Sequence, residues 1–178
     1  MNAIRRYVPR YTYDDYARWE GKWELWDGVA ISMSPSPFGR HQRAAKLWMG
    51  QLESAIGHTN CDAEVIHELD WIADDTTVLR PDVMVVCGQI PEEHLRRAPG
   101  LVLEVLSDST RDRDLGPKHQ MYQDYGVAVY MVVDPITGEV SAWQLIGNQY
   151  KPVDTTSPFA VSLCNDCKIE LDTSIVRI

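Results

Sequence analysis

Three short apolar runs constrain the fold of this chain more than any other feature of its sequence. They are RPDVMVV at 80–86, LVLEVL at 101–106 and VAVYMVVDP at 127–135. Runs that are apolar on both faces are typical of strands covered on both sides of a sheet. The last two runs are separated by a helix predicted from about Leu115 to Tyr125, which indicates a strand–helix–strand crossover. We therefore expect an α/β fold of the α+β type, with a mixed β-sheet flanked by helices.

The other segments fit around this sheet in a single domain of residues 1–178. Asp27-Gly28 predicts a hairpin turn between the strands on either side of it, and residues 41–57 have the apolar period of a helix. The run at 139–153 predicts a second hairpin. The remaining expectations are a helix start at Thr12, a strand in AEVIHELDWI (63–72) and a strand in TTVLRPDVMVVCG (76–88).

Two of the apolar runs each contain a carboxylate, Asp82 in the first and Glu104 in the second. Burying an ionised carboxylate costs several kcal/mol unless a cation, a hydrogen-bond donor or a metal compensates it. Side chains alternate along a strand, so Glu104 shares a face with Val102 and Leu106. We predict that Asp82 and Glu104 lie on adjacent strands and are compensated at one site.

The predicted helix after Glu104 carries a lysine on its inner face. Leu115, Lys118, Tyr122 and Tyr125 are spaced three, four and three residues apart, so they share one face. Lysine is uncommon on an inner face unless it is paired. We expect Lys118 to reach back toward Glu104 and to stay charged in the absence of metal.

An aspartate, a glutamate and a lysine at one strand end suit metal-dependent cleavage of phosphodiesters. Carboxylate oxygens are the ligands that Mg²⁺ and Mn²⁺ prefer. A bound metal lowers the pKa of water and neutralises phosphate charge, and a desolvated lysine stabilises developing negative charge. The alternative is a structural ion pair with no catalytic role.

Four segments in the same order resemble the Uma family of restriction endonucleases, within the PD-(D/E)xK nuclease superfamily. They are WELWDGVAISMSPSPFGRH, RPDVMVV, LVLEVLSDSTRDRDLGPKHQMYQDYGV and YMVVDP, and the resemblance runs from about residue 11 to 150. It implies a restriction-endonuclease-like core, with N-terminal and C-terminal hairpins and Mg²⁺ or Mn²⁺ at the centre.

The resemblance also implies roles for individual residues. Asp82 and Glu104 match the acidic residues of the family motif, which hold the metal and act in catalysis. The superfamily lysine would stand at Leu106, and Lys118 matches the helix lysine that this family uses instead. Glu24 and His41 match a hairpin glutamate and a histidine that opens the next helix, and both are candidates for supporting contacts around the metal. His41 can alternatively cap its helix.

The charge of the chain argues against nucleic-acid binding, but its distribution is uneven. The net charge is −9, with 17 Lys and Arg against 26 Asp and Glu. Proteins that bind DNA usually present a basic surface to the phosphates. Arg40, Arg43 and Lys46 recur every third residue, and they are candidates for a local DNA-binding rim or for ordinary solvated side chains. An N-terminal arm with Arg5, Arg6 and Arg10 offers the same two alternatives.

Two functions of different classes follow from these observations. The first is a Mg²⁺-dependent DNA endonuclease, a hydrolase, for which double-strand cleavage favours a homodimer. The second is a non-catalytic binding or assembly module that keeps the fold, which the acidic net charge favours. Binding of Mn²⁺ and nicking of plasmid DNA separate the two.

Cellular location is inferred from segments that the sequence lacks. No stretch reaches the roughly 18 apolar residues of a membrane span, and the first ten residues lack the apolar core of a secretory signal. We expect a cytoplasmic protein that does not associate with membranes.

The four cysteines do not indicate a disulfide framework or a zinc site. Cys61, Cys87, Cys164 and Cys167 are few and scattered for disulfides. The CNDC motif at 164–167 lacks a second pair or a nearby histidine for zinc. We interpret it as an ordinary loop.

Overall fold

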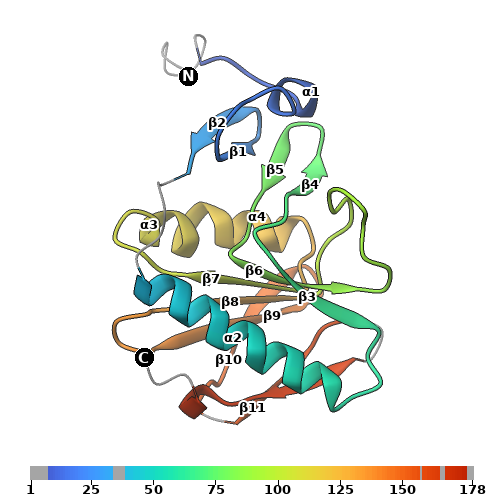
Figure 1. Ribbon diagram of the computed structural model, residues 1–178, viewed down its shortest axis with the longest axis vertical. Coiled ribbons are helices and arrows are strands. Elements are labelled where there is room, and N and C mark those ends of the chain that lie inside the picture. The colour runs from blue at the N-terminus through green and yellow to red at the C-terminus, as the bar shows by residue number, and fades with distance from the viewer. Residues whose placement is uncertain (1–7, 34–38, 157, 165–166, 176–178) are drawn as a thin grey trace.

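The computed structural model describes residues 8–33, 39–156, 158–164 and 167–175, and a six-stranded mixed sheet forms the centre of the described chain (Figure 1). The strand order is β10-β9-β8-β7-β6-β3. Only β7 and β8 pair in parallel, as the crossover between them requires, and the other neighbours are antiparallel. The strands are β3 (Ala63–His67), β6 (Val83–Cys87), β7 (Leu101–Val105), β8 (Val129–Val133), β9 (Val140–Ile146) and β10 (Gln149–Val153).

Helices cover both faces of this sheet (Figure 1). The long helix α2 lies on one face, and the helical segment that follows β7 lies on the other. The helices are α1 (Tyr13–Tyr16), α2 (Gly39–Gly57), α3 (Arg111–Arg113), the π-helical turn η2 (Asp114–Lys118), α4 (His119–Asp124) and the 3-10 helix η3 (Thr173–Ile175). The expected mixed sheet flanked by helices is confirmed.

The alternation of side chains along β7 divides the core into two layers. Leu101 and Leu103 pack with Trp48 and Leu52 of α2. Val102, on the opposite face, packs in the layer that contains Tyr122 of α4. Glu104 belongs to this second face by the same alternation, and it therefore points toward the helical segment that contains Lys118.

The N-terminal part forms a separate four-stranded sheet above the main one (Figure 1). The strand order is β2-β1-β5-β4, and the strands are β1 (Trp23–Trp26), β2 (Val29–Ser32), β4 (Trp71–Asp74) and β5 (Thr77–Leu79). The predicted hairpin at Asp27-Gly28 is confirmed, since both residues have positive φ values, 45° and 75°. The expected helix start is also present, because the Asp15 carboxylate accepts a bond from the Thr12 amide at 3.0 Å.

Two expected strands are each broken in the structure. The run at 63–72 splits into β3 and β4, and the run at 76–88 splits into β5 and β6, so each run contributes to both sheets. The breaks lie at Glu68, which has a positive φ of 49°, and at Pro81, which cannot donate to a strand ladder. Continuous strands were wrong predictions, and the second break places Asp82 at the edge between the sheets.

The chain ends in a hairpin that the sequence did not predict. After the expected hairpin of β9 and β10, strands β11 (Phe159–Ser162) and β12 (Lys168–Leu171) pair antiparallel beneath α2 (Figure 1). Their apolar side chains alternate into the layer that α2 covers; these are Phe159, Val161, Ile169 and Leu171.

The interpretation of the cysteines was wrong. Cys61 bonds to Cys167 and Cys87 bonds to Cys164, so all four form disulfides. The terminal hairpin brings Cys164 to Cys87 at the end of β6 and Cys167 to Cys61, four residues after α2 ends, and this proximity does not follow from sequence spacing. Among the described helices, none has the length and apolar character needed to cross a membrane.

Candidate active site

Asp82 and Glu104 lie opposite each other on neighbouring strands. Val83 pairs with Leu103 in the antiparallel β6–β7 ladder, which places the preceding residue, Asp82, across from Glu104. The Asp82 amide donates to Glu104 Oε2 at 3.4 Å, and the Val105 amide donates to Asp82 Oδ2 at 2.8 Å. The predicted placement is confirmed, whereas the roles of the two carboxylates stay predictions.

Glu104 is buried, and its Oε1 atom accepts two short hydrogen bonds. Lys118 Nζ donates from 2.8 Å and the Tyr122 hydroxyl donates from 2.5 Å. Both donors come from the helical segment after β7, which the crossover lays over this face of the sheet. These donors compensate the buried carboxylate in the absence of metal.

Lys118 is itself surrounded by carboxylates. Besides Glu104, its ammonium lies 3.2 Å from Glu24 Oε1 and 3.8 Å from Asp114 Oδ1. The lysine is only 6% exposed, and its acidic partners are equally buried. We call Lys118 and these three acidic residues the Lys118 cluster. It contains one cation for three carboxylates, so it has less positive than negative charge when all three are ionised.

A π-helical turn changes which residue faces the cluster. The wider turn η2 places Asp114 inward at 2% exposure, whereas Leu115 is 45% exposed. The prediction that Leu115 shares the inner face with Lys118 was wrong, because it assumed a regular α-helical period. Asp114 and Tyr122 were not predicted as site residues, although each stands four residues from Lys118, a spacing that can bring side chains together.

Glu24 joins the N-terminal hairpin to the cluster. Its Oε1 accepts from the Arg80 amide at 2.8 Å as well as facing Lys118, and its Oε2 accepts from Trp26 Nε1 at 3.1 Å. The glutamate is buried, so both oxygens find donors within the protein. Glu24 thus fixes the position of Lys118 from the side of the smaller sheet.

His41 approaches Asp82 from the other face of the sheet. His41 Nε2 lies 3.2 Å from Asp82 Oδ2, and the two side chains are 12% and 22% exposed. Its Nδ1 atom is buried without a hydrogen-bond partner in the described chain. Burial lowers the pKa of His41, but its contacts with Asp82 outweigh burial and raise the pKa overall. The pair is therefore a charged contact at mildly acidic pH.

Burial and shared charge shift the pKa values within the cluster. Burial raises the pKa of Glu104 well above its usual value, although Lys118 opposes this, and burial likewise raises the pKa of Asp114 to about 6. Burial lowers the pKa of Lys118, but Glu104, Glu24 and Asp114 outweigh it and hold the pKa well above its usual value. We infer that Lys118 stays charged while the carboxylates compete for protons.

The donor set fits a hard divalent cation. Asp82 Oδ1 accepts no hydrogen bond from the described residues, and Glu104 Oε2 accepts only the long bond from the Asp82 amide. Each carboxylate thus keeps an oxygen for Mg²⁺ or Mn²⁺. No group of three His, Cys, Asp or Glu side chains in the described ranges is arranged for a metal ion, so an ion held by these two carboxylates would need solvent or substrate oxygens as further ligands.

A hollow of about 260 Å³ opens beside Asp82. It is lined by side chains from α2 and from the end of β3, among them His41, Lys46, His67 and Glu68. Lys46 is exposed at the hollow, and Arg43 is exposed on the same helix. Arg40 is also exposed but has interactions of its own.

The N-terminal arm is only partly described. Arg5 and Arg6 lie outside the described residues. Arg10 forms an exposed salt bridge with Asp27 at 3.0 Å.

Comparisons with known proteins identify the family of the chain and a solved structure with a similar fold. Residues 13–174 match the model of the Uma2 family, described as "Putative restriction endonuclease". The fold is similar to a crystal structure from Anabaena variabilis, described as "a putative nuclease belonging to DUF820". The TM-score is 0.71 at 17% identity, over 92% of this chain and 96% of that one. No curated protein matches the chain.

Proposed function

Because the chain belongs to the Uma2 family, we propose that it is a nuclease that hydrolyses phosphodiester bonds of DNA with the help of Mg²⁺ or Mn²⁺. The observation that carries this proposal is the pairing of Asp82 and Glu104 at the ends of adjacent strands. Each has an oxygen left for a cation, and Lys118 stands 2.8 Å from Glu104.

The reaction adds the oxygen of water to phosphorus and breaks one phosphorus–oxygen bond of the DNA strand. When bound, the metal ion supplies positive charge to the phosphate and lowers the pKa of water. Asp82 and Glu104 would hold the ion through the oxygens that lack short bonds. Tyr122 would keep Glu104 in one orientation, since its hydroxyl bonds the opposite oxygen.

Lys118 is proposed as the catalytic cation of the protein itself. Its ammonium is buried among carboxylates and stays charged, and it needs no surface exposure to act on charge that develops beside Glu104. Such a preorganised charge in a water-poor site is effective because it does not have to reorient during the reaction. Glu24 and Asp114 hold the ammonium in place.

DNA would approach over the hollow beside Asp82. Lys46 lines the hollow and Arg43 is exposed on the same helix, so α2 offers local positive charge despite the net charge of −9. A homodimer is proposed because cleavage of both strands requires two active sites. A cytoplasmic location is proposed because DNA is accessible there.

Metal binding and DNA cleavage test the proposal directly. Calorimetry should detect Mn²⁺ binding by the purified protein, and supercoiled plasmid should be nicked with Mg²⁺ or Mn²⁺ but not with EDTA. Asp82→Asn and Glu104→Gln should each abolish both Mn²⁺ binding and plasmid nicking. Glu139→Gln, at an exposed glutamate, is the matched control. Wild-type cleavage by the Glu104→Gln variant would refute the assignment of the site.

The acidic net charge favours a second function, a non-catalytic binding module with the same fold. In such a protein the cluster of Lys118 with Glu24, Glu104 and Asp114 would be a structural ion network. Protein that binds neither Mn²⁺ nor duplex DNA would support this function. Mn²⁺ binding without nicking would indicate a metal-binding protein that has lost catalysis.

A further inference from the structure

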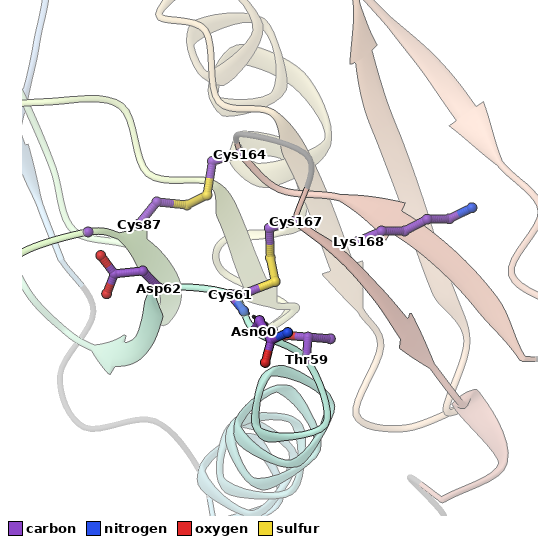
Figure 2. A pocket seen from close by; sticks show the side chains of 9 residues that line it. Thr59, Asn60, Cys61, Asp62, Cys87, Cys164, Cys167 and Lys168 are labelled. Carbon is purple, nitrogen blue, oxygen red and sulfur yellow. Dashed lines mark hydrogen bonds between the residues drawn. A yellow bond between two sulfur atoms is a disulfide. The ribbon is translucent and has the colours of Figure 1, made fainter.

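All four cysteines meet in one pocket at the end of the molecule that carries the terminal hairpin. The pocket has a volume of about 500 Å³, within the range of small-molecule sites, and both disulfides line it (Figure 2). Lys168 and Asp62 also line it, but Figure 2 shows their charged ends directed away from the sulfur atoms. Both disulfides thus form part of the pocket wall, with no charged group directed at their sulfur atoms from these two residues.

The disulfides are the only covalent links between the terminal hairpin and the rest of the described fold besides the chain itself. Strands β11 and β12 pair with each other and, as described, share no ladder with the six-stranded sheet. The hairpin is otherwise held by apolar packing and by side-chain hydrogen bonds. Gln144 exchanges two bonds of 2.9 Å with the Ser162 backbone, and Gln51 donates to the Asp172 carbonyl.

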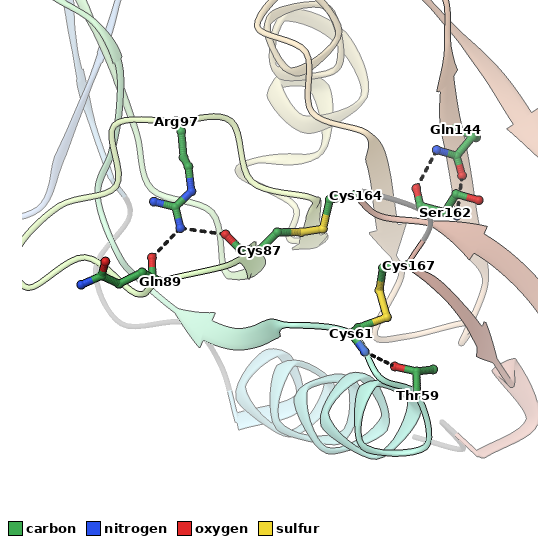
Figure 3. Close-up of a disulfide and its surroundings, with 9 residues drawn as sticks. All are labelled: Thr59, Cys61, Cys87, Gln89, Arg97, Gln144, Ser162, Cys164 and Cys167. Atoms are coloured by element: carbon green, nitrogen blue, oxygen red, sulfur yellow. Dashed lines mark hydrogen bonds between the residues drawn. A yellow bond between two sulfur atoms is a disulfide. The ribbon is translucent and has the colours of Figure 1, made fainter.

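Local hydrogen bonds order the backbone beside the cysteines (Figure 3). The Cys61 amide donates to Thr59 Oγ1 at 3.1 Å, and Arg97 donates to the Cys87 carbonyl at 2.8 Å. The Cys167 amide donates to the Cys164 carbonyl at 2.7 Å. These bonds order the backbone locally on each side of the disulfides, whereas the hydrogen bonds of Gln144 and Gln51 are the ones that link the hairpin to the rest of the described fold after reduction.

Space beside the second disulfide is kept open by a glycine at the start of β7. A side chain on Gly100 would place its Cβ 2.8 Å from Cys87 Sγ and 3.6 Å from Cys164 Sγ. Contacts at 2.8 Å are closer than van der Waals packing allows. Glycine at position 100 therefore leaves room for the disulfide between Cys87 and Cys164.

We propose that this pocket is a thiol–disulfide exchange site, at which a small thiol of the glutathione class locks and unlocks the terminal hairpin. In a reducing compartment, disulfides of proteins are usually transient and redox-sensing. The pocket is separate from the candidate active site, because it includes none of the residues of that site, and reduction of its disulfides can be measured whether or not the protein cleaves DNA.

The exchange balances with the thiol as the only co-reactant. A thiolate attacks one sulfur of the disulfide, the sulfur–sulfur bond breaks, and the released cysteine takes up a proton. A second thiol molecule attacks the mixed disulfide, which frees the other cysteine and leaves the two small molecules joined as their own disulfide. Each protein disulfide gains two electrons and two protons, and re-oxidation reverses every step.

Reduction of the disulfides would also affect α2, because the terminal hairpin and α2 pack in the same core layer. The hairpin side chains Phe159 and Ile169 lie in the same core layer as Trp48 and Leu52 of that helix. The two disulfides close loops of 106 and 77 residues, and long loops make cross-links effective in constraining the unfolded chain. Reduction should therefore loosen the hairpin first and weaken the support of α2.

The experiment uses the full chain in glutathione buffers that range from oxidising to reducing. Alkylation followed by intact mass should count no free thiols in the oxidised form and four in the reduced form. Peptide mapping should pair Cys61 with Cys167 and Cys87 with Cys164. Reduction should lower the midpoint of thermal unfolding by about 10 °C or more. Hydrogen exchange should speed up in β11 and β12 while β7 stays protected.

Cysteine-to-serine variants distinguish the effect of reducing the disulfides from any other effect of glutathione on stability. Cys61→Ser with Cys167→Ser should retain roughly half of the thermal shift, and replacing all four cysteines by serine should remove any response to glutathione. If the fourfold variant does not fold, the titration of the wild-type protein decides alone. Four free thiols under oxidising glutathione would overturn the proposal. Equal midpoints of thermal unfolding and equal hydrogen-exchange rates in the oxidised and reduced protein would overturn it as well. Stoichiometric Zn²⁺ bound by thiols that resist oxidation would replace it with a metal site.

Discussion

Lys118 determines the charge balance of the candidate site more than any other residue. Its ammonium contacts Glu104 and Glu24 and lies near Asp114, all of them buried. Losing one partner of a buried ion network is costly because the other charges are left without compensation. Changes at this residue and at its neighbours therefore test both the chemistry and the electrostatics of the site.

The first prediction concerns catalysis by this lysine. Lys118→Met should leave Mn²⁺ binding largely intact while lowering plasmid cleavage by roughly 10²-fold or more, the usual scale for losing a catalytic electrostatic group. Calorimetry and single-turnover nicking assays measure the two effects. Lys151→Met, at an exposed lysine on β10, controls for the loss of a charge. Unchanged cleavage in the Lys118 variant would exclude this lysine from the mechanism.

The second prediction concerns pH and rests on Asp114. Burial raises the pKa of this carboxyl from 3.8 to about 6, so the folded protein binds its proton more tightly than the unfolded chain does. The resulting stability is complete below about pH 4 and is lost as pH rises through 6. Above that pH the ionised carboxylate costs at most about 3 kcal/mol.

Asp114→Asn should remove this cost in the metal-free protein. At pH 8 with EDTA its free energy of unfolding should exceed that of the wild type by up to about 3 kcal/mol, and the difference should vanish near pH 4. Urea unfolding across this range measures the difference. Asp124→Asn, at an exposed position on the same helical segment, should show no such trend. A variant less stable than wild type at pH 8 would show that the ionised carboxylate is stabilising.

At the scale of elements, the arrangement of the site depends on two departures from regular structure. The π-helical turn η2 places Asp114 beside Lys118, and the break at Pro81 places Asp82 where the two sheets meet. Apolar periodicity predicted the sheet, the crossover helix and the neighbouring positions of Asp82 and Glu104. It did not predict these departures, because period and propensity describe regular elements and not the tertiary contacts that distort them.

The terminal hairpin was missed for a related reason. Each of its strands is four residues long, and the cysteines that anchor it are separated by 106 and 77 residues in the chain. Spacing of cysteines does not determine connectivity. Family resemblance identified Glu24 as a candidate for a supporting contact around the metal, but its contact with Lys118 and the grouping of three carboxylates around that lysine required the three-dimensional structure.

The third prediction concerns the hairpin that carries Glu24. Gly28 has a φ of +75°, and a Cβ there would lie 3.3 Å from the Tyr11 carbonyl oxygen. Gly28→Ala should therefore lower the free energy of unfolding by roughly 1 to 3 kcal/mol. Gly50→Ala in α2 is a control of opposite sign, since open space surrounds that glycine and alanine favours a helix by about 1 kcal/mol. Urea unfolding of both variants measures the difference, and equal stability of Gly28→Ala and wild type would refute the strain argument.

At the scale of the whole molecule, the charge of −9 opposes the approach of DNA from most directions. A protein of this kind can bind a polyanion only where local charge is reversed. The hollow beside Asp82 is bordered by Lys46, with Arg43 exposed on the same helix, whereas Lys151 lies exposed on the distant strand β10. Binding should therefore depend on where a positive charge lies and not only on the total.

The fourth prediction tests this dependence on position. In a Lys118→Met background with Mn²⁺, Lys46→Glu and Arg43→Glu should each weaken duplex binding at least tenfold at low salt, and each should reduce the slope of log affinity against log salt by up to about 1. Lys151→Glu changes the net charge by the same amount and should alter affinity little. Fluorescence anisotropy over a range of salt concentrations measures all three. Equal losses in the three variants would mean that overall repulsion governs binding. DNA would then have no preferred surface at the hollow, and the non-catalytic function would be favoured.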